Sequence, residues 1–151
     1  MRKLLSGLVL SACILSGATA PSVAADYYGA EPAAPMNEAA FVPSCQDEKV
    51  LAQVEDQFEY GAAYMLKADL TIDEFRDPFE KAFFPLSEDR PIERRYCQGE
   101  VVLSNLEKHT IYYVISYPLG FASIGWKAEG CVLGLDKWYV YGANCQSLRR
   151  F

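Results

Sequence analysis

Five cysteines and one histidine are the residues of this sequence with the most distinctive chemistry, namely Cys13, Cys45, Cys97, Cys131, Cys145 and His109. A zinc site needs Cys or His ligands in close pairs such as CxxC, and the sequence contains no such pair. A redox-active thiol needs a partner close in sequence or a group that lowers its pKa, and wide spacing does not indicate one. The pattern predicts structural cysteines, with no metal and no cofactor.

The sequence gives little support for other catalytic arrangements. Acyl transfer needs a nucleophile, a base and an oxyanion hole, but Ser123 lacks a GxSxG context and His109 lies beside a predicted turn. No glycine-rich phosphate-binding loop follows a predicted strand. Glu100 and Glu129 could share a sheet face, so a carboxylate-dependent hydrolase stays open as a minor alternative. We otherwise expect no catalytic residues.

The charge balance narrows the class of partner. The chain has 14 Lys and Arg against 20 Asp and Glu, a formal charge of -6. Its basic residues are scattered, which argues against nucleic acid as a partner because phosphate binding needs clustered Lys and Arg. Hydrophobic residues make up 51% of the sequence, too many for a disordered chain.

Residues 1–25 have the pattern of a secretory signal peptide. Arg2 and Lys3 precede an apolar run over residues 4–15, and Ala25 ends a stretch of small residues suited to cleavage. Because the run is shorter than the roughly 20 residues that span a bilayer, we expect no stable membrane span after cleavage. Removing two of the 14 basic residues and no acid leaves 12 against 20, or -8.

Two further features of the N-terminal region qualify this interpretation. The stretch Leu10-Ser11-Ala12-Cys13 resembles a lipobox, so lipidation of Cys13 stays open as an alternative to its removal with the signal peptide. Residues 26–44 are rich in Ala, Pro, Gly and acids without a periodic apolar pattern, which predicts a flexible leader. The expected location is periplasmic or secreted.

Residues 45–151 form one expected domain with four cysteines. An exported chain enters an oxidising compartment, so two disulfides are expected, and four cysteines allow three pairings. We favour Cys45 with Cys97 and Cys131 with Cys145, because the second pair closes a short loop across an expected hairpin.

A helix is predicted over residues 46–67, where Val50, Val54 and Phe58 recur at helical spacing and face a core. A short strand is predicted over residues 70–75. Residues 76–91 hold three phenylalanines between prolines and are predicted to be a long loop.

The C-terminal half predicts four strands, over residues 94–104, 109–117, 122–132 and 138–144. In the third of these, alternation places Ile124, Trp126, Ala128 and Val132 on the face toward the helix and Lys127, Glu129 and Cys131 on the opposite face. The expected fold class is α+β: one N-terminal helix packed on a four- to five-stranded antiparallel meander sheet, held by disulfides.

Two resemblances follow from this pattern. The arrangement resembles the cystatin-like and NTF2-like architecture, a curved antiparallel sheet around a helix. The last 60 or so residues also resemble a family of small exported alphaproteobacterial proteins of unknown function. This second resemblance depends on Arg95-Tyr96-Cys97, the run from Gly120 to Trp126, Gly134-Leu135-Asp136 and the later Trp138, Tyr141 and Cys145. It implies export and disulfides and carries over no catalytic residue.

The function predicted from these observations is binding without catalysis. Aromatic residues are dense on neighbouring predicted strands and cannot all enter the core, so some are expected at a recognition surface. We expect an envelope-associated protein that binds a protein or envelope component through the outer sheet face, helped by the 76–91 loop. The partner-binding residues expected on that face are Tyr112, Lys127, Glu129, Tyr139 and Tyr141.

Two alternatives remain from the sequence. A small-molecule pocket between helix and sheet would be lined by Phe58, Trp126 and Trp138. The acidic charge would also suit an inhibitor of a basic enzyme such as a lysozyme, which requires binding that weakens steeply with salt.

Overall fold

The computed structural model describes residues 40–149. The predicted signal peptide, Cys13 and residues 26–39 of the predicted leader lie outside this range.

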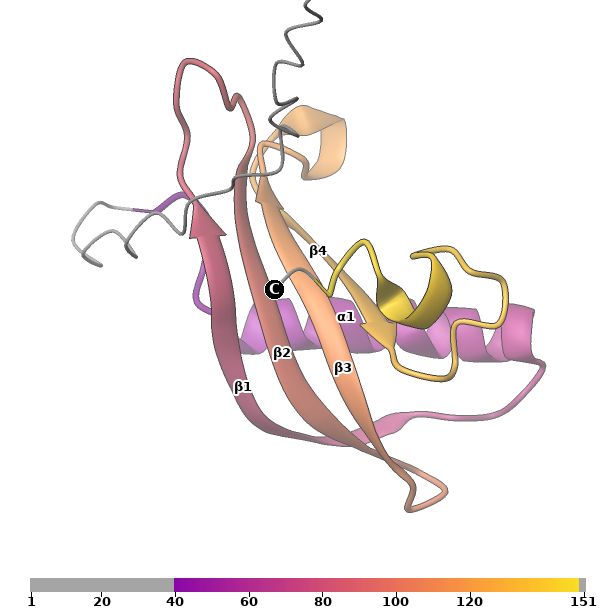
Figure 1. Cartoon of the computed structure of the whole chain (residues 1–151). Helices are drawn as coiled ribbons and strands as arrows, with labels where there is room; N and C mark the ends of the chain where they lie inside the picture. Colours follow the sequence, from indigo (N-terminus) through magenta and orange to yellow (C-terminus); the bar gives the residue numbers. More distant parts are fainter. Residues whose placement is uncertain (1–39, 150–151) are drawn as a thin grey trace, which may run out of the picture. The chain divides into compact units, whose positions relative to one another are not determined.

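One helix packs on a four-stranded antiparallel sheet (Figure 1). The elements in chain order are α1 (Glu48–Gly61), a π-helical turn (Ala62–Leu66), β1 (Ile72–Phe84), β2 (Glu93–Leu103), β3 (Lys108–Tyr117) and β4 (Lys127–Val132). The strands lie in sequence order, so each pairs with its neighbours along the chain. This confirms the predicted α+β class.

Helix α1 begins where the sequence provides a cap. The Asp47 carboxylate accepts the Lys49 N–H at 2.9 Å, and Glu48 places a negative charge near the positive end of the helix dipole. Val50 and Val54 are buried against the sheet. The regular helix is shorter than predicted. After Gly61 the helix widens into the π-helical turn, which ends at Lys67 in the left-handed conformation.

The side of the sheet that faces α1 is called the inner face, and the opposite side the outer face. Along β3, Ile111, Tyr113 and Ile115 belong to the inner core, as the alternation predicts. Tyr112 and Val114 point to the outer face and are also buried. The sheet is therefore covered on both sides.

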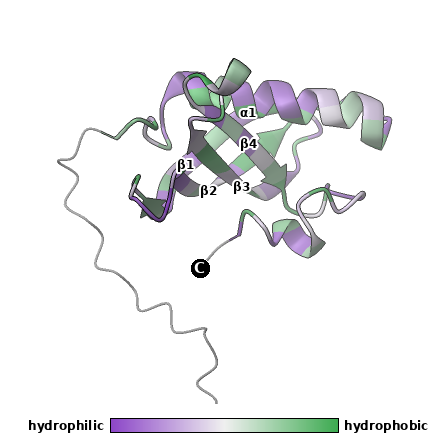
Figure 2. Ribbon diagram, turned by 90° about the horizontal axis from the view of Figure 1, so that it is seen from above, coloured by the Kyte–Doolittle hydropathy of each residue, from purple (hydrophilic) through white to green (hydrophobic). Residues whose placement is uncertain are grey.

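The outer face is covered by the later part of residues 133–149, called here the C-terminal segment. Earlier in the segment, Leu135 packs on the inner core and Trp138 contacts Met65. Figure 2 shows α1 on one side of the sheet and the end of this segment on the other. Leu148 and Cys145 pack there with Tyr96 and Tyr112. A segment without regular strands thus completes the second apolar layer.

Each cover is attached to the sheet by one disulfide. Cys45, just before α1, bonds to Cys97 of β2. Cys145 of the C-terminal segment bonds to Cys131 of β4. The predicted pairing is confirmed, although the second bond holds an irregular segment on the sheet and does not cross a hairpin.

The prediction of a long loop over residues 76–91 is wrong for residues 76–84 and holds for residues 85–91, which connect β1 to β2. Strand β1 continues through Pro78 to Phe84, with irregular register between Arg76 and Phe79. Pro78 is tolerated because β1 is an edge strand, where a missing N–H removes no bond to a second neighbour. Pro85 marks the end of the strand, whereas Pro78 lies within it.

The predicted strand at residues 138–144 is also wrong, and the one at 122–132 is too long. Positive φ values at Tyr139, Gly142 and Asn144 turn the chain repeatedly. Ala122 and Ser123 likewise have positive φ, so β4 begins only at Lys127. As a result Ile124 is exposed and does not face the helix, while Ala128 and Val132 do belong to the inner core.

The last part of the predicted flexible leader is packed on the domain. Val42 is buried, and its N–H donates to the buried Glu93 carboxylate at 2.9 Å. Phe41 stacks on Tyr117 with ring centroids 4.7 Å apart. The folded domain therefore includes residues before Cys45.

Candidate binding groove

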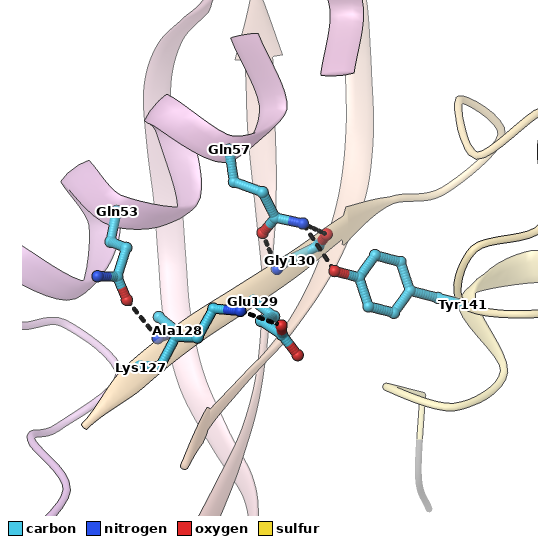
Figure 3. Close-up of polar contacts among 7 residues, drawn as sticks. All are labelled: Gln53, Gln57, Lys127, Ala128, Glu129, Gly130 and Tyr141. Carbon is cyan, nitrogen blue, oxygen red and sulfur yellow. Dashed lines mark hydrogen bonds and ion pairs between the residues drawn. The ribbon is translucent and has the colours of Figure 1, made fainter. Parts of the chain in front are cut away.

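The free edge of β4 is occupied by two glutamine side chains of α1 (Figure 3). The Gln53 amide oxygen accepts the Ala128 N–H. The Gln57 amide oxygen accepts the Gly130 N–H at 2.7 Å, and its nitrogen lies 3.3 Å from the Gly130 carbonyl. Gln53 and Gln57 are four residues apart and therefore lie on one face of the helix. Ala128 and Gly130 are two apart and therefore point their backbone groups to one edge of the sheet, so each glutamine meets one of them.

Gly130 permits this close approach of helix and strand. A Cβ atom at this position would lie 2.6 Å from Cγ1 of the buried Val54. Only a residue without a side chain lets α1 lie directly against the β4 edge.

The C-terminal segment joins the same network through Tyr141. The Gln57 side-chain nitrogen donates to the Tyr141 hydroxyl at 2.7 Å. Upstream, the Asp136 carboxylate accepts the backbone N–H groups of Val140 at 2.9 Å and Tyr141 at 2.8 Å. Asp136 therefore fixes the loop that carries Trp138 and places Tyr141 over the β4 edge.

Between the end of α1 and this loop lies an apolar hollow of about 240 Å³, called here the groove. Its walls come from α1, the π-helical turn, β4 and the C-terminal segment, with apolar contributions from Phe58, Ala62, Met65, Val132, Leu135 and Trp138. The indole N–H of Trp138 donates to the Met65 carbonyl at 3.3 Å and connects the two walls.

Exposed aromatic side chains lie at the groove and beside it, and of these Tyr60 and Trp138 line it. Tyr60 and Tyr64 lie on the helical side, with ring centroids 4.5 Å apart, and both are exposed. Trp138 and Tyr139 are exposed on the loop side. Tyrosine and tryptophan offer rigid contact area that loses little entropy on binding, so this rim is suited to recognition.

The helix beside the groove is acidic. Burial and the neighbouring Glu59 and Asp56 carboxylates raise the pKa of Glu55. Burial and, to a smaller extent, the Glu129 carboxylate raise the pKa of the Tyr141 hydroxyl, which is therefore neutral near pH 7. Of the residues that line the groove itself, Asp136 and Lys137 are charged and have opposite signs, so a preference for a positively charged partner depends on the acidic helix and on the net charge of -6.

The structure separates the residues predicted to bind a partner. Tyr112 is only 9% exposed beneath the C-terminal segment, so the expectation that it lies on an open sheet face is wrong. Lys127 and Glu129 do lie on the outer side of β4, where they pair with each other at 2.6 Å. Tyr139 and Tyr141 lie in the C-terminal segment, and only Tyr139 is exposed.

The residues predicted to form a small-molecule pocket also divide. Phe58 and Trp138 line the groove. Trp126 precedes the opposite end of β4 and packs against the inner core. The sequence interpretation did not assign Tyr60 and Met65 to the pocket, although the dense apolar residues at the end of the predicted helix were a usable signal.

Glu100, Glu129 and His109, the groups considered for catalysis from the sequence, lie on different strands of the sheet. In the sheet register Glu100 of β2 lies opposite Thr110 of β3, and Glu129 of β4 lies opposite Val114 of β3. The four residues from 110 to 114 separate the two glutamate backbones by roughly 13 Å along the strand direction. Glycosidase carboxylates are about 5–9.5 Å apart. The His109 ring contacts the Leu133 carbonyl at 3.1 Å and the Glu107 carboxylate at 3.4 Å.

Residues 40–149 contain neither a metal-binding cluster nor a membrane-spanning helix. No group of three or more His, Cys, Asp or Glu side chains in this range could hold a metal ion. No helix in the described range is long and apolar enough to cross a bilayer.

Comparison with known proteins adds no identity. No family model, curated protein or solved structure matches the chain. Of the resemblances drawn from the sequence, the structure supports only the coarse one, a helix followed by a four-stranded antiparallel sheet.

Proposed function

We propose that this chain is an exported, non-catalytic protein that binds a protein partner of the cell envelope through the groove. The proposal moves the binding surface away from the outer sheet face, where the C-terminal segment covers Tyr112. The observation that carries it is the apolar hollow lined in part by exposed Tyr60 and Trp138.

The size of the hollow favours a protein partner over a small ligand. Ligand pockets commonly have volumes of about 300–1,000 Å³. The groove has about 240 Å³ and is open, which suits one or two inserted side chains of a larger surface. The small-molecule alternative is therefore the weaker of the two.

The charge near the groove defines the partner further. Helix α1 carries Glu55, Asp56 and Glu59 in its second half, with no basic residue there. A partner with an apolar side chain surrounded by Lys or Arg would complement both features. Binding should weaken as salt rises, because these acids are near solvent.

Two disulfides fit an oxidising compartment outside the cytoplasm. We propose a periplasmic or secreted location after removal of residues 1–25. Lipidation at Cys13 is the alternative, and the intact mass of the exported protein distinguishes the two.

Site-specific photo-crosslinking in the cell envelope tests the proposed surface. A photoreactive residue at Tyr60 or Trp138, which both line the groove, should give the same crosslinked partner, and one at Leu106, an exposed apolar residue in the β2–β3 turn, should not. Trp138→Ala should remove the Tyr60 crosslink. Equal crosslinking at all three positions, or none at Tyr60 and Trp138, would contradict the proposal.

A further inference from the structure

The β3–β4 connection presents a second apolar surface, separate from the groove. Phe121 is 96% exposed and Ile124 is 76% exposed, and Leu119 beside them is also exposed. These three residues define what is called here the loop tip. Side chains of this size are costly to leave in water, so their exposure requires a reason.

The loop tip has a defined backbone conformation. The Ile124 N–H donates to the Phe121 carbonyl at 3.0 Å, and the two residues between them, Ala122 and Ser123, have positive φ. Such a turn brings its first and last residues together as a pair, so Phe121 and Ile124 lie next to each other.

The base of the loop is equally constrained. The Gly120 N–H donates to the Gly125 carbonyl at 3.1 Å. A Cβ atom on Gly120 would lie 2.0 Å from the Ile124 carbonyl oxygen, so only glycine fits here. The apolar pair is thus held outward by the fold.

The composition of the loop identifies what it can contact. Residues 116–126 contain no charged side chain, and half-buried Tyr117 and Trp126 lie at the two ends of the loop. Apolar side chains beyond a Tyr and Trp base are the arrangement found at membrane interfaces. Leu119 lines a hollow of about 150 Å³ with Ser116, Lys127 and Glu129, but Phe121 and Ile124 are not part of it. The most exposed part of the tip therefore gives a protein partner neither a pocket nor a charge pattern to recognise, whereas a bilayer requires no matching shape.

We propose that the loop tip inserts into the interfacial layer of a lipid bilayer and attaches the domain to it reversibly. The internal hydrogen bonds of the turn lower the cost of moving its backbone out of water. Three side chains give shallow insertion, with the rest of the domain in water. The acidic charge of the chain selects zwitterionic headgroups over anionic ones.

Vesicle flotation with the purified, disulfide-bonded protein tests this. The protein should float with phosphatidylcholine vesicles, and mixing in phosphatidylglycerol should lower the bound fraction. Phe121→Asp should lower the partition coefficient by about tenfold or more, since it replaces an aromatic ring that would be buried in the bilayer by a charge. Leu106→Asp is the matched control, because Leu106 is 81% exposed in a turn at the other end of the sheet.

Trp126 provides a second readout. In a Trp138→Phe background its emission should shift to shorter wavelength on vesicle addition, and Phe121→Asp should remove the shift. An unchanged melting temperature shows that Phe121→Asp leaves the fold intact.

Three results would overturn the proposal. They are no flotation with phosphatidylcholine, equal flotation of the Phe121→Asp and original proteins, and an equal loss with Leu106→Asp. A photoreactive residue at position 121 that captures a protein and no lipid would assign the tip to a protein partner.

Discussion

Helix α1 covers the inner face of the sheet, whereas the irregular C-terminal segment covers the outer face. The inner cover is a capped 14-residue helix with buried valines, attached by a disulfide that spans 52 residues. The outer cover has only short turns, fixed by Asp136, and its disulfide spans 14 residues. The comparison indicates that the inner layer determines the stability of the domain, while the outer layer depends on its local attachments.

Removal of the Cys45–Cys97 bond should have the largest effect. In the chain-entropy treatment, a loop of this length corresponds to about 4 kcal/mol of unfolding free energy. The Cys45→Ala/Cys97→Ala double variant should therefore unfold at much lower denaturant in a single transition. A loss confined to local exchange near Cys45 would contradict the role given to the inner layer.

Removal of the Cys131–Cys145 bond should cost about 3 kcal/mol by the same treatment. We expect faster hydrogen exchange across residues 133–149 in the Cys131→Ala/Cys145→Ala variant, while α1 keeps its protection. Exchange measured by mass spectrometry on both double variants compares the two covers directly. Equal loss of protection in α1 would mean that the layers are not separable.

Gly130→Ala should destabilise the contact between α1 and β4 by about 1–3 kcal/mol, because the added methyl group would overlap Val54. Gly61→Ala is the control, since nothing lies near its added Cβ. Urea denaturation of both variants tests the difference. A Gly130→Ala protein as stable as the original would contradict the close approach.

Gln57→Ala should lower the unfolding free energy by about 1–2 kcal/mol, since the Gly130 N–H loses its partner. The Gly130 amide should then exchange faster. Asp56→Ala, on the same helix but exposed, should leave both quantities nearly unchanged. The loss of unfolding free energy should be smaller than that caused by removing either disulfide, because Gln57 connects the two covers by hydrogen bonds but neither cover depends on it for its attachment to the sheet.

Alkaline pH should produce a shallow fall in stability. Burial raises the pKa of Tyr113 and Tyr141 in the folded protein. Above about pH 10 the unfolded chain loses the phenolic protons while the folded chain retains them, so stability is full below pH 10 and decreases above it. Denaturant midpoints at pH 8 and pH 11 test this, and Tyr141→Phe should reduce the decrease without abolishing it.

The inner layer was largely predictable from the sequence, and the outer layer was not. Periodic valines indicate α1, and alternation places Tyr113 and Tyr112 on the correct faces of β3. The aromatic residues of 138–144 predict a strand, but Tyr139 and Asn144 adopt positive φ without being glycine. Residue type alone does not predict that conformation.

The candidate groove was only half predictable for the same reason. Phe58 and Trp138 follow from apolar content, but bringing them together requires the reversal around Asp136. That reversal depends on one carboxylate accepting two backbone N–H groups, a contact that sequence periodicity does not report. Pro78 led to a predicted loop where the structure has a strand, because proline disrupts a strand only when that strand has a second neighbour.

The Gln53 and Gln57 amides have a consequence for behaviour at high concentration. An unpaired strand edge is a template on which another chain can add, the first step toward aggregated cross-β material. On β4 the outward N–H groups of Ala128 and Gly130 are already bonded, and on the other margin β1 carries Pro78, a register irregularity and charged side chains. Both margins therefore disfavour growth of the sheet by strand addition.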